Sequence, residues 1–263
     1  MTTEEHGLDV IEKELEQYPA ALVTEFKRAT KSLDGNLTPE NLQQWAAEGL
    51  DIARLAFRTW EAASEYFKAS PKTVEMLPFP QLIAWGHCGK ALAEESPLIS
   101  IAFFKASPGV AGYLPPYQLS EWAQLGRSLY KGTWKSTSLS ISFFELSPRL
   151  LRYMNLSDMN RFVPFIDNLA QKSYDLANEC LNLADRVLPS IDRQDLPAFF
   201  LLTGTLLESN WRDARNCFEA GGKVLGRIEK SQRGRFLRLA EQLARVDGSL
   251  GVSFFMDVSR ALE

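Results

Sequence analysis

The chain has 263 residues, of which 45% are hydrophobic, so it carries enough apolar side chains for a substantial core. Its net charge of −4 argues against a protein that binds nucleic acid over its whole surface, because such proteins are usually basic. Three cysteines give no even disulfide framework and favour a reducing compartment. The acidic start and the lack of a long apolar run favour a cytoplasmic protein without a membrane span.

An amphipathic segment opens the chain. Its apolar side chains recur at helical spacing with an interruption at Pro19, and they are Leu8, Ile11, Leu15, Leu22 and Phe26. We predict that residues 1–37 form a capping helix, because terminal repeats are often atypical and acidic side chains suit a solvated outer face. Thr38 and Pro39 then predict the start of the next helix.

From residue 38 onward, one pattern recurs with a period of 37 to 40 residues. Its first marker is a pair of adjacent positions, the second of which is Phe67, Phe104, Phe144, Leu181, Phe218 and Phe255. Its second marker, about half a period away, is Trp45, Trp85, Trp122, Phe162, Phe200 and Phe236. The agreement of two independent markers over about six units indicates a true internal repeat.

The second marker has the spacing of one helical face. An aliphatic residue follows each marker seven positions later, and a small residue follows five of the six markers four positions later; the small residues are Gly49, Gly89, Gly126, Gly204 and Ala240. A small residue lets a neighbouring helix approach closely. We therefore predict an all-α protein, in which residues 38–263 form an α-solenoid of about six helix-pair repeats of the HEAT, armadillo or TPR kind.

Four Ser-Pro pairs punctuate this array: Ser70-Pro71, Ser96-Pro97, Ser107-Pro108 and Ser147-Pro148. Serine caps orphan amides and proline cannot continue a helix, so we predict that each pair ends one helix and begins the next. A kinase site is the alternative, but the periodic placement already has a structural explanation. The pattern loosens from residue 155, where we expect a change of curvature.

Few residues are candidates for chemistry. His87 and Cys88 are sequence neighbours, so on a helix they point about 100° apart and form no dyad; we expect His87 to be packed or capped. Cys180 and Cys217 lie one period apart beside core positions, and we expect small semi-buried packing residues. No nucleotide-binding or metal motif is present, so we expect no cofactor, no metal and no catalytic residue.

Two further features have competing interpretations. Residues 247–251 resemble the start of the metal motif of von Willebrand factor A (VWA) domains, but helical residues precede them and we predict an inter-helix loop. The tryptophans near the predicted inter-helix turns are expected to be half-buried, although exposed ones would act as interface hot spots; these are Trp60, Trp134 and Trp211.

A basic cluster is the strongest surface candidate. It comprises Lys223, Arg227, Lys230, Arg233, Arg235 and Arg238, with Arg245 beyond them, and only Glu229 and Glu241 oppose it. Positive charge on an otherwise acidic chain steers acidic partners, so we predict a partner-binding surface here. A solvated helical face without a partner is the alternative.

The repeat resembles the N-terminal helical region of long bacterial VWA-domain proteins. The matching stretches are Leu42–Gly49, Leu82–Gly89 (with Gly86 in place of Ala), Leu119–Gly126 and the three Phe/Tyr-Phe-x-x-Ser-Pro segments. These proteins include the NorD and CbbO groups, which work with MoxR-type AAA+ ATPases; in the CbbO case the complex remodels inhibited Rubisco. The resemblance implies a non-enzymatic adaptor that docks on an ATPase or on its client protein. It carries over no catalytic residue.

Two other functions remain open from the sequence. A HEAT-like nucleic-acid-binding protein, such as a helical-repeat DNA glycosylase, would use the basic cluster and the tryptophans. A hydrolase with a pocket between repeats is the third hypothesis, although the sequence nominates no nucleophile for it. The ending Leu262-Glu263 resembles a vector-derived junction, which would make the chain a fragment of a longer protein; a native ending is the alternative.

Overall fold

The structure is a computed structural model that describes residues 5–132 and 137–261. The chain forms two compact units, residues 1–127 and residues 128–263. The helices that begin in the first unit are α1 (Glu5–Leu15), α2 (Ala20–Leu33), α3 (Pro39–Arg54), α4 (Thr59–Val74), α5 (Phe79–Glu95), α6 (Pro97–Val110) and α7 (Leu119–Lys131). Those of the second are α8 (Thr137–Leu150), α9 (Leu156–Lys172), α10 (Tyr174–Val187), α11 (Leu196–Ser209), α12 (Trp211–Arg227), α13 (Lys230–Val246) and α14 (Gly248–Ala261).

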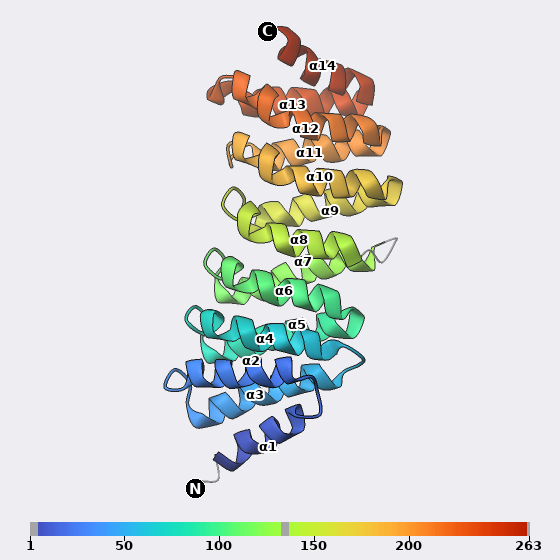
Figure 1. Cartoon of the computed structure of the whole chain (residues 1–263). Coiled ribbons are helices and arrows are strands. Elements are labelled where there is room, and N and C mark those ends of the chain that lie inside the picture. Colours follow the sequence, from blue (N-terminus) through green and yellow to red (C-terminus); the bar gives the residue numbers. More distant parts are fainter. Residues whose placement is uncertain (1–4, 133–136, 262–263) are drawn as a thin grey trace. The chain divides into compact units, whose positions relative to one another are not determined.

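Within each unit the helices alternate between two layers (Figure 1). In the first unit, α2, α4 and α6 are neighbours in one layer, while α1, α3 and α5 are neighbours in the other. In the second unit, α8, α10, α12 and α14 form one layer, and α9, α11 and α13 form the other. Helix pairs stacked in chain order confirm the predicted α-solenoid.

Stacked rings join the successive repeats of the first unit. Tyr66 of α4 lies 5.1 Å from Trp85 of α5 between ring centroids, and Phe103 of α6 lies 5.1 Å from Trp122 of α7. Inside one repeat, Trp85 meets Phe104 at 5.0 Å with its ring edge-on. All of these rings are buried, so the first unit has a continuous aromatic core.

The predicted close approach at the repeat glycines is confirmed in the first unit. A Cβ atom built on Gly49 would lie 2.2 Å from Cζ of Phe67, and one on Gly89 would lie 1.9 Å from Cζ of Phe104. Only glycine at these two positions therefore allows the rings of Phe67 and Phe104 to pack directly against the helix backbone.

Helix α11 departs from the predicted register by one residue. A Cβ atom on Gly204 would meet no described atom within 4 Å, so Gly204 does not pack against a neighbouring ring. Phe199 and Thr203 are fully buried instead, and Phe199 lies 37 residues after Phe162 and 37 before Phe236. The assignment of Phe200 and Gly204 to the repeat marker was therefore wrong, because two adjacent phenylalanines fit the apolar pattern in either register.

Three of the Ser-Pro pairs lie inside helices, which corrects the prediction that they end them. Helices α4, α6 and α8 continue through Pro71, Pro108 and Pro148. Nε1 of Trp45 donates to the hydroxyl of Ser70 at 2.9 Å, and Ser70 donates to the carbonyl of Tyr66 at 2.6 Å. The serine thus supplies the acceptor that a buried indole requires. Ser96-Pro97 alone starts a helix as predicted, with Pro97 in the first turn of α6.

Candidate functional site

Arg233 is buried, although the sequence placed it in the exposed basic cluster. Its guanidinium meets Oδ2 of Asp192 at 2.5 Å, and its Nε donates to the carbonyl of Ile228 at 3.0 Å. It faces inward because it shares the core-facing side of α13 with Phe236, Leu237 and Ala240. Arg233 therefore connects the loop before α11 to α13, and its assignment as a surface contact is corrected.

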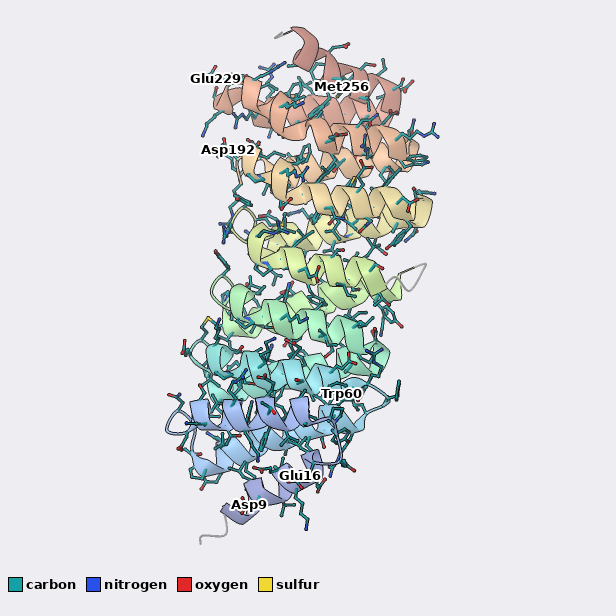
Figure 2. The ribbon with its side chains drawn as sticks, in the orientation of Figure 1. Asp9, Glu16, Trp60, Asp192, Glu229 and Met256 are labelled. Atoms are coloured by element: carbon teal, nitrogen blue, oxygen red, sulfur yellow. The ribbon has the colours of Figure 1, made fainter. Side chains whose placement is uncertain are left out.

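Asp195 completes this buried network. One of its carboxylate oxygens lies 3.9 Å from Arg233 and accepts no hydrogen bond from a described residue. Burial raises the pKa of the Asp195 carboxyl, and the guanidinium of Arg233 acts in the opposite direction. Lys230, which is exposed, meets Asp192 at 3.3 Å from the other side. Asp192 and Glu229 mark the edge of the unit where these loops lie (Figure 2).

The remaining basic residues are exposed on two helices. Lys223 and Arg227 belong to α12, whereas Arg235 and Arg238 lie on the outer face of α13. Neither Arg235 nor Arg238 has an ion-pair partner within residues 5–132 and 137–261. The predicted cluster is therefore divided between two helices, and its charge on α13 that has no ion-pair partner among the described residues reduces to these two arginines.

A groove of about 330 Å³ lies beside them, between α13 and α14, and we call it the end groove. It is mostly apolar. Its lining is formed by Ile228, Gln232, Arg235, Phe236, Leu239, Phe254 and Val258.

The end groove consists of positions that other repeats bury. Leu239 is 42% exposed, whereas Leu202, its counterpart in α11, is fully buried. Phe254 is half-buried, whereas its counterparts Tyr66 and Phe103 are fully buried under the indoles of the next odd-numbered helix. The last helix pair thus presents an interior packing face that none of the described residues covers.

A second feature concerns the aromatic residue that marks each odd-numbered helix from α5 onward, which we call the ring marker; these residues are Trp85, Trp122, Phe162, Phe199 and Phe236. The fifth residue after the ring marker is here called the bridge position. In α5 it is Lys90, whose Nζ meets Asp51 of α3 at 2.8 Å. In α7 it is Arg127, which meets Glu95 of α5 at 2.6 Å. In α13 it is Glu241, which accepts a hydrogen bond from Thr205 of α11 at 3.4 Å. A side chain at this position therefore reaches the preceding odd-numbered helix.

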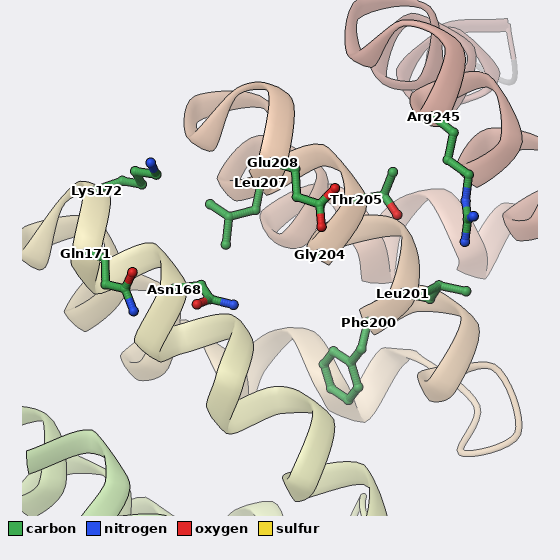
Figure 3. A pocket seen from close by; sticks show the side chains of 10 residues that line it. All are labelled: Asn168, Gln171, Lys172, Phe200, Leu201, Gly204, Thr205, Leu207, Glu208 and Arg245. Atoms are coloured by element: carbon green, nitrogen blue, oxygen red, sulfur yellow. The ribbon is translucent and has the colours of Figure 1, made fainter. Parts of the chain in front are cut away.

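In α11 the bridge position is Gly204, and a cavity of about 670 Å³ opens there, which we call the hollow (Figure 3). Its walls come from α9, α11 and α13. Its polar lining is Asn168, Gln171, Lys172, Thr205, Glu208 and Arg245, and its apolar lining is Phe200, Leu201 and Leu207. This site was not predicted from the sequence, because Gly204 was assigned to the small position of the repeat; the spacing of 37 residues from Phe162 to Phe199 and from Phe199 to Phe236 was the signal that could have revealed it.

The remaining sequence candidates are one exposed histidine and two buried cysteines. The packed or capped role predicted for His87 is corrected, because its side chain is exposed and reaches Oε2 of the buried Glu48 with Nε2 at 3.1 Å. Cys180 and Cys217 are fully buried rather than semi-buried, and burial raises the pKa of both thiols, that of Cys180 to about 12. They are correspondingly poor nucleophiles.

The loop predicted for residues 247–251 is corrected to a single junction residue, Asp247, because α13 ends at Val246 and α14 already begins at Gly248. Oδ1 of Asp247 accepts hydrogen bonds from the amide and the hydroxyl of Ser249, both at 2.7 Å, and these bonds lower the pKa of Asp247. Trp60 and Trp211 are half-buried at the starts of α4 and α12, which confirms that expectation. Trp134 lies outside the described residues.

Comparisons with protein-family models, with curated proteins and with solved structures find no match to this chain. The resemblance to VWA-associated proteins therefore stays a prediction from the residues. Among the described residues, no helix combines the length and the apolar character that crossing a membrane requires. No three His, Cys, Asp or Glu side chains gather as a metal site in the same part of the chain.

Proposed function

We propose that the chain is a non-enzymatic protein-interaction scaffold whose end groove receives an amphipathic helix of a partner protein. One observation carries the proposal: Leu239 and Phe254 occupy positions that other repeats bury, yet they stay partly exposed beside Arg235. Burial of apolar side chains is the main favourable contribution to association, and a helix laid in a groove is a common recognition mode.

The repeats of the first unit indicate what the partner helix would present. There the ring equivalent to Phe254 is Tyr66 or Phe103, and it stacks on the indole of the following odd-numbered helix. A partner helix would place an aromatic side chain on Phe254 in the same way. Acidic residues on that helix would face Arg235 and Arg238, whose charges have no ion-pair partner among the described residues.

The adaptor function extends this proposal to a class of partner. Its support is the resemblance of the Leu-x-x-Trp-Ala-x-x-Gly repeats to VWA-associated proteins, so the partner helix would belong to a MoxR-type AAA+ ATPase or to its client. A cytoplasmic location fits this function, and Cys88, Cys180 and Cys217 are all free thiols.

A peptide from the chain itself tests the groove. Residues 115–131 contain α7, whose Trp122 covers Phe103, and an acidic version carries Gln124→Glu and Ser128→Glu. We expect the acidic peptide to bind the full chain, measured by fluorescence anisotropy, and Leu239→Asp to weaken binding at least about tenfold, because it removes apolar contact from the groove. Leu98→Asp is the matched control, since Leu98 is similarly exposed but lies on α6.

Two results would overturn the proposal. One is binding that Leu239→Asp and a Trp122→Ala peptide leave unchanged. The other is tight, strongly salt-dependent binding of a labelled DNA duplex that Arg235→Glu and Arg238→Glu abolish, which would favour the nucleic-acid function instead. A purified MoxR-type ATPase captured by the wild type and lost with Leu239→Asp would support the adaptor form.

A further inference from the structure

The hollow lies where the pattern of bridges between odd-numbered helices is interrupted. Lys90, Arg127 and Glu241 each contact the preceding odd-numbered helix from the bridge position. Asp167, at the same position in α9, also lies close to its neighbour, because a Cβ atom on Gly132 would come within 2.1 Å of its Oδ1. Gly204 has no side chain with which to do this, and the built Cβ at Gly204 finds no described atom within 4 Å.

The charge around the hollow indicates which side chain is missing. Arg127 at the bridge position of α7 pairs with Glu95, the tenth residue after the ring marker of α5. The tenth residue after the ring marker of α9 is Lys172, which has the opposite charge. Its ammonium is exposed and forms no ion pair with any residue that the structure describes. The complement of Lys172 at the bridge position would be a carboxylate.

The other lining residues agree with this polarity. The amide of Asn168 lies on α9 beside the open space and can donate a hydrogen bond (Figure 3). Arg245 adds a second positive charge, partly neutralised by its ion pair with Glu241. Glu208 is the one acidic residue in the lining set, against Lys172 and Arg245. Phe200 and Leu201 supply an apolar wall for the carbon chain that would carry the carboxylate.

We propose that the hollow is a carboxylate-binding site. The ligand is the side chain of an Asp or Glu of a partner polypeptide, or a small carboxylic acid, and its carboxylate pairs with Lys172 in the space that the absent side chain of residue 204 leaves open. This site is separate from the end groove and does not depend on it.

Substitutions at Gly204 give a matched test. Gly204→Ala should raise the melting temperature by about 2–4 °C, because alanine is the better helix former and the space is open. Gly204→Glu should also be a better helix former than glycine, and it fills the hollow with an internal carboxylate. A loss of binding in Gly204→Glu alone, with a melting temperature no lower than that of the wild type, reports occupation of the site.

The probes are acetylated, amidated Leu-Glu-Phe, the same peptide with Gln in place of Glu, and glutarate, each followed by NMR shifts of residues in α9 and α11. We expect the Glu peptide to bind about tenfold more tightly than the Gln peptide. Binding should be lost in Lys172→Glu and in Gly204→Glu, kept in Gly204→Ala, and strengthened in Glu208→Gln. Glutarate binding as tight as that of the peptide would identify a small acid as the ligand; weaker binding would identify a polypeptide.

Equal affinity for the Glu and Gln peptides, or full binding by Gly204→Glu, would overturn the proposal. Weaker binding in Glu208→Gln would also overturn it, because Glu208 would then support binding instead of repelling the carboxylate of the ligand.

Discussion

Ser70 connects the indole of one helix to the backbone of the next. It accepts from Trp45 and donates to Tyr66, while the hydroxyl of Tyr66 donates to the carbonyl of Trp45 at 3.2 Å. Ser107 has the same relation to Trp85, at 2.8 Å. These hydrogen bonds satisfy polar groups in an interior where an unpaired donor is costly.

Ser70→Ala is expected to destabilise the first unit by about 1–3 kcal/mol, because the N–H of Trp45 would lose its buried acceptor. Ser96→Ala is the control, since Ser96 belongs to another Ser-Pro pair but caps α6 without a side-chain hydrogen bond in the described structure. Urea denaturation measures both. Equal effects of the two substitutions would contradict the role assigned to the Trp–Ser bond.

The free energy of unfolding is expected to depend on pH through the carboxyl group of Glu48. Burial raises the pKa of its carboxyl, while the positive charges of His87 and Lys90 act against this. The folded state therefore holds a proton that the unfolded state has released, so stability falls as pH rises from the ordinary carboxyl value through the raised one. Glu48→Gln removes this loss.

The comparison is best made in a His87→Gln background, which removes the imidazole that contacts Glu48. Between pH 4 and pH 7, we expect the free energy of unfolding of the Glu48→Gln variant to rise relative to that of its parent. Denaturant titrations at four or five pH values provide the measurement. A difference that stays constant over this range would refute the assignment.

At the scale of the helix, glycine has opposite roles at different positions. Gly89→Ala should destabilise the chain by about 1–3 kcal/mol, because the new methyl group would overlap the ring of Phe104. Gly234→Ala should stabilise it by up to about 1 kcal/mol, since Gly234 lies inside α13 with open space around it. Denaturant midpoints measure both changes, and a destabilising Gly234→Ala would show that the space around Gly234 in α13 is not open.

The helices were predictable from the sequence wherever core packing alone determines the pattern of apolar residues. Trp45, Gly49 and Ile52 recur at the spacing of one helical face, and the structure buries that face. Prediction failed where a distant partner decides the outcome. Pro71 stays inside α4, where the hydroxyl of Ser70 serves an indole 25 residues earlier, and Arg233 is buried because Asp192, 41 residues earlier, receives it.

The candidate sites were harder to predict for the same reason. The end groove is defined by what does not cover Leu239, and the hollow by a side chain that Gly204 lacks. The repeat period predicts which positions are buried in the core. A position that is left uncovered, or a space that is left unfilled, is recognised only from the three-dimensional arrangement of the neighbouring helices. The basic residues were visible from the sequence, whereas their division between a buried network and an exposed face was not.

For the whole molecule, the layered arrangement predicts that damage stays local. Helix α4 contacts α2, α3, α5 and α6, all within residues 1–127. Ser70→Ala should therefore speed amide hydrogen exchange in these helices and leave α11 to α14 nearly unchanged, because repeat arrays are stabilised mainly by neighbours. Exchange followed by mass spectrometry measures each segment, and equal acceleration in α12 would instead show that the chain unfolds as one unit.

The aromatic core also has a spectroscopic consequence. The fully buried indoles of Trp45, Trp85 and Trp122 all lie in residues 1–127, where they stack on other rings, whereas Trp211 in the second unit is half-buried. Near-ultraviolet circular dichroism should therefore be dominated by the first unit, and the loss of that signal on heating would mark its unfolding. A melting curve recorded this way describes half of the chain, and the second unit, with its phenylalanine core, has to be followed through its helical signal in the far ultraviolet.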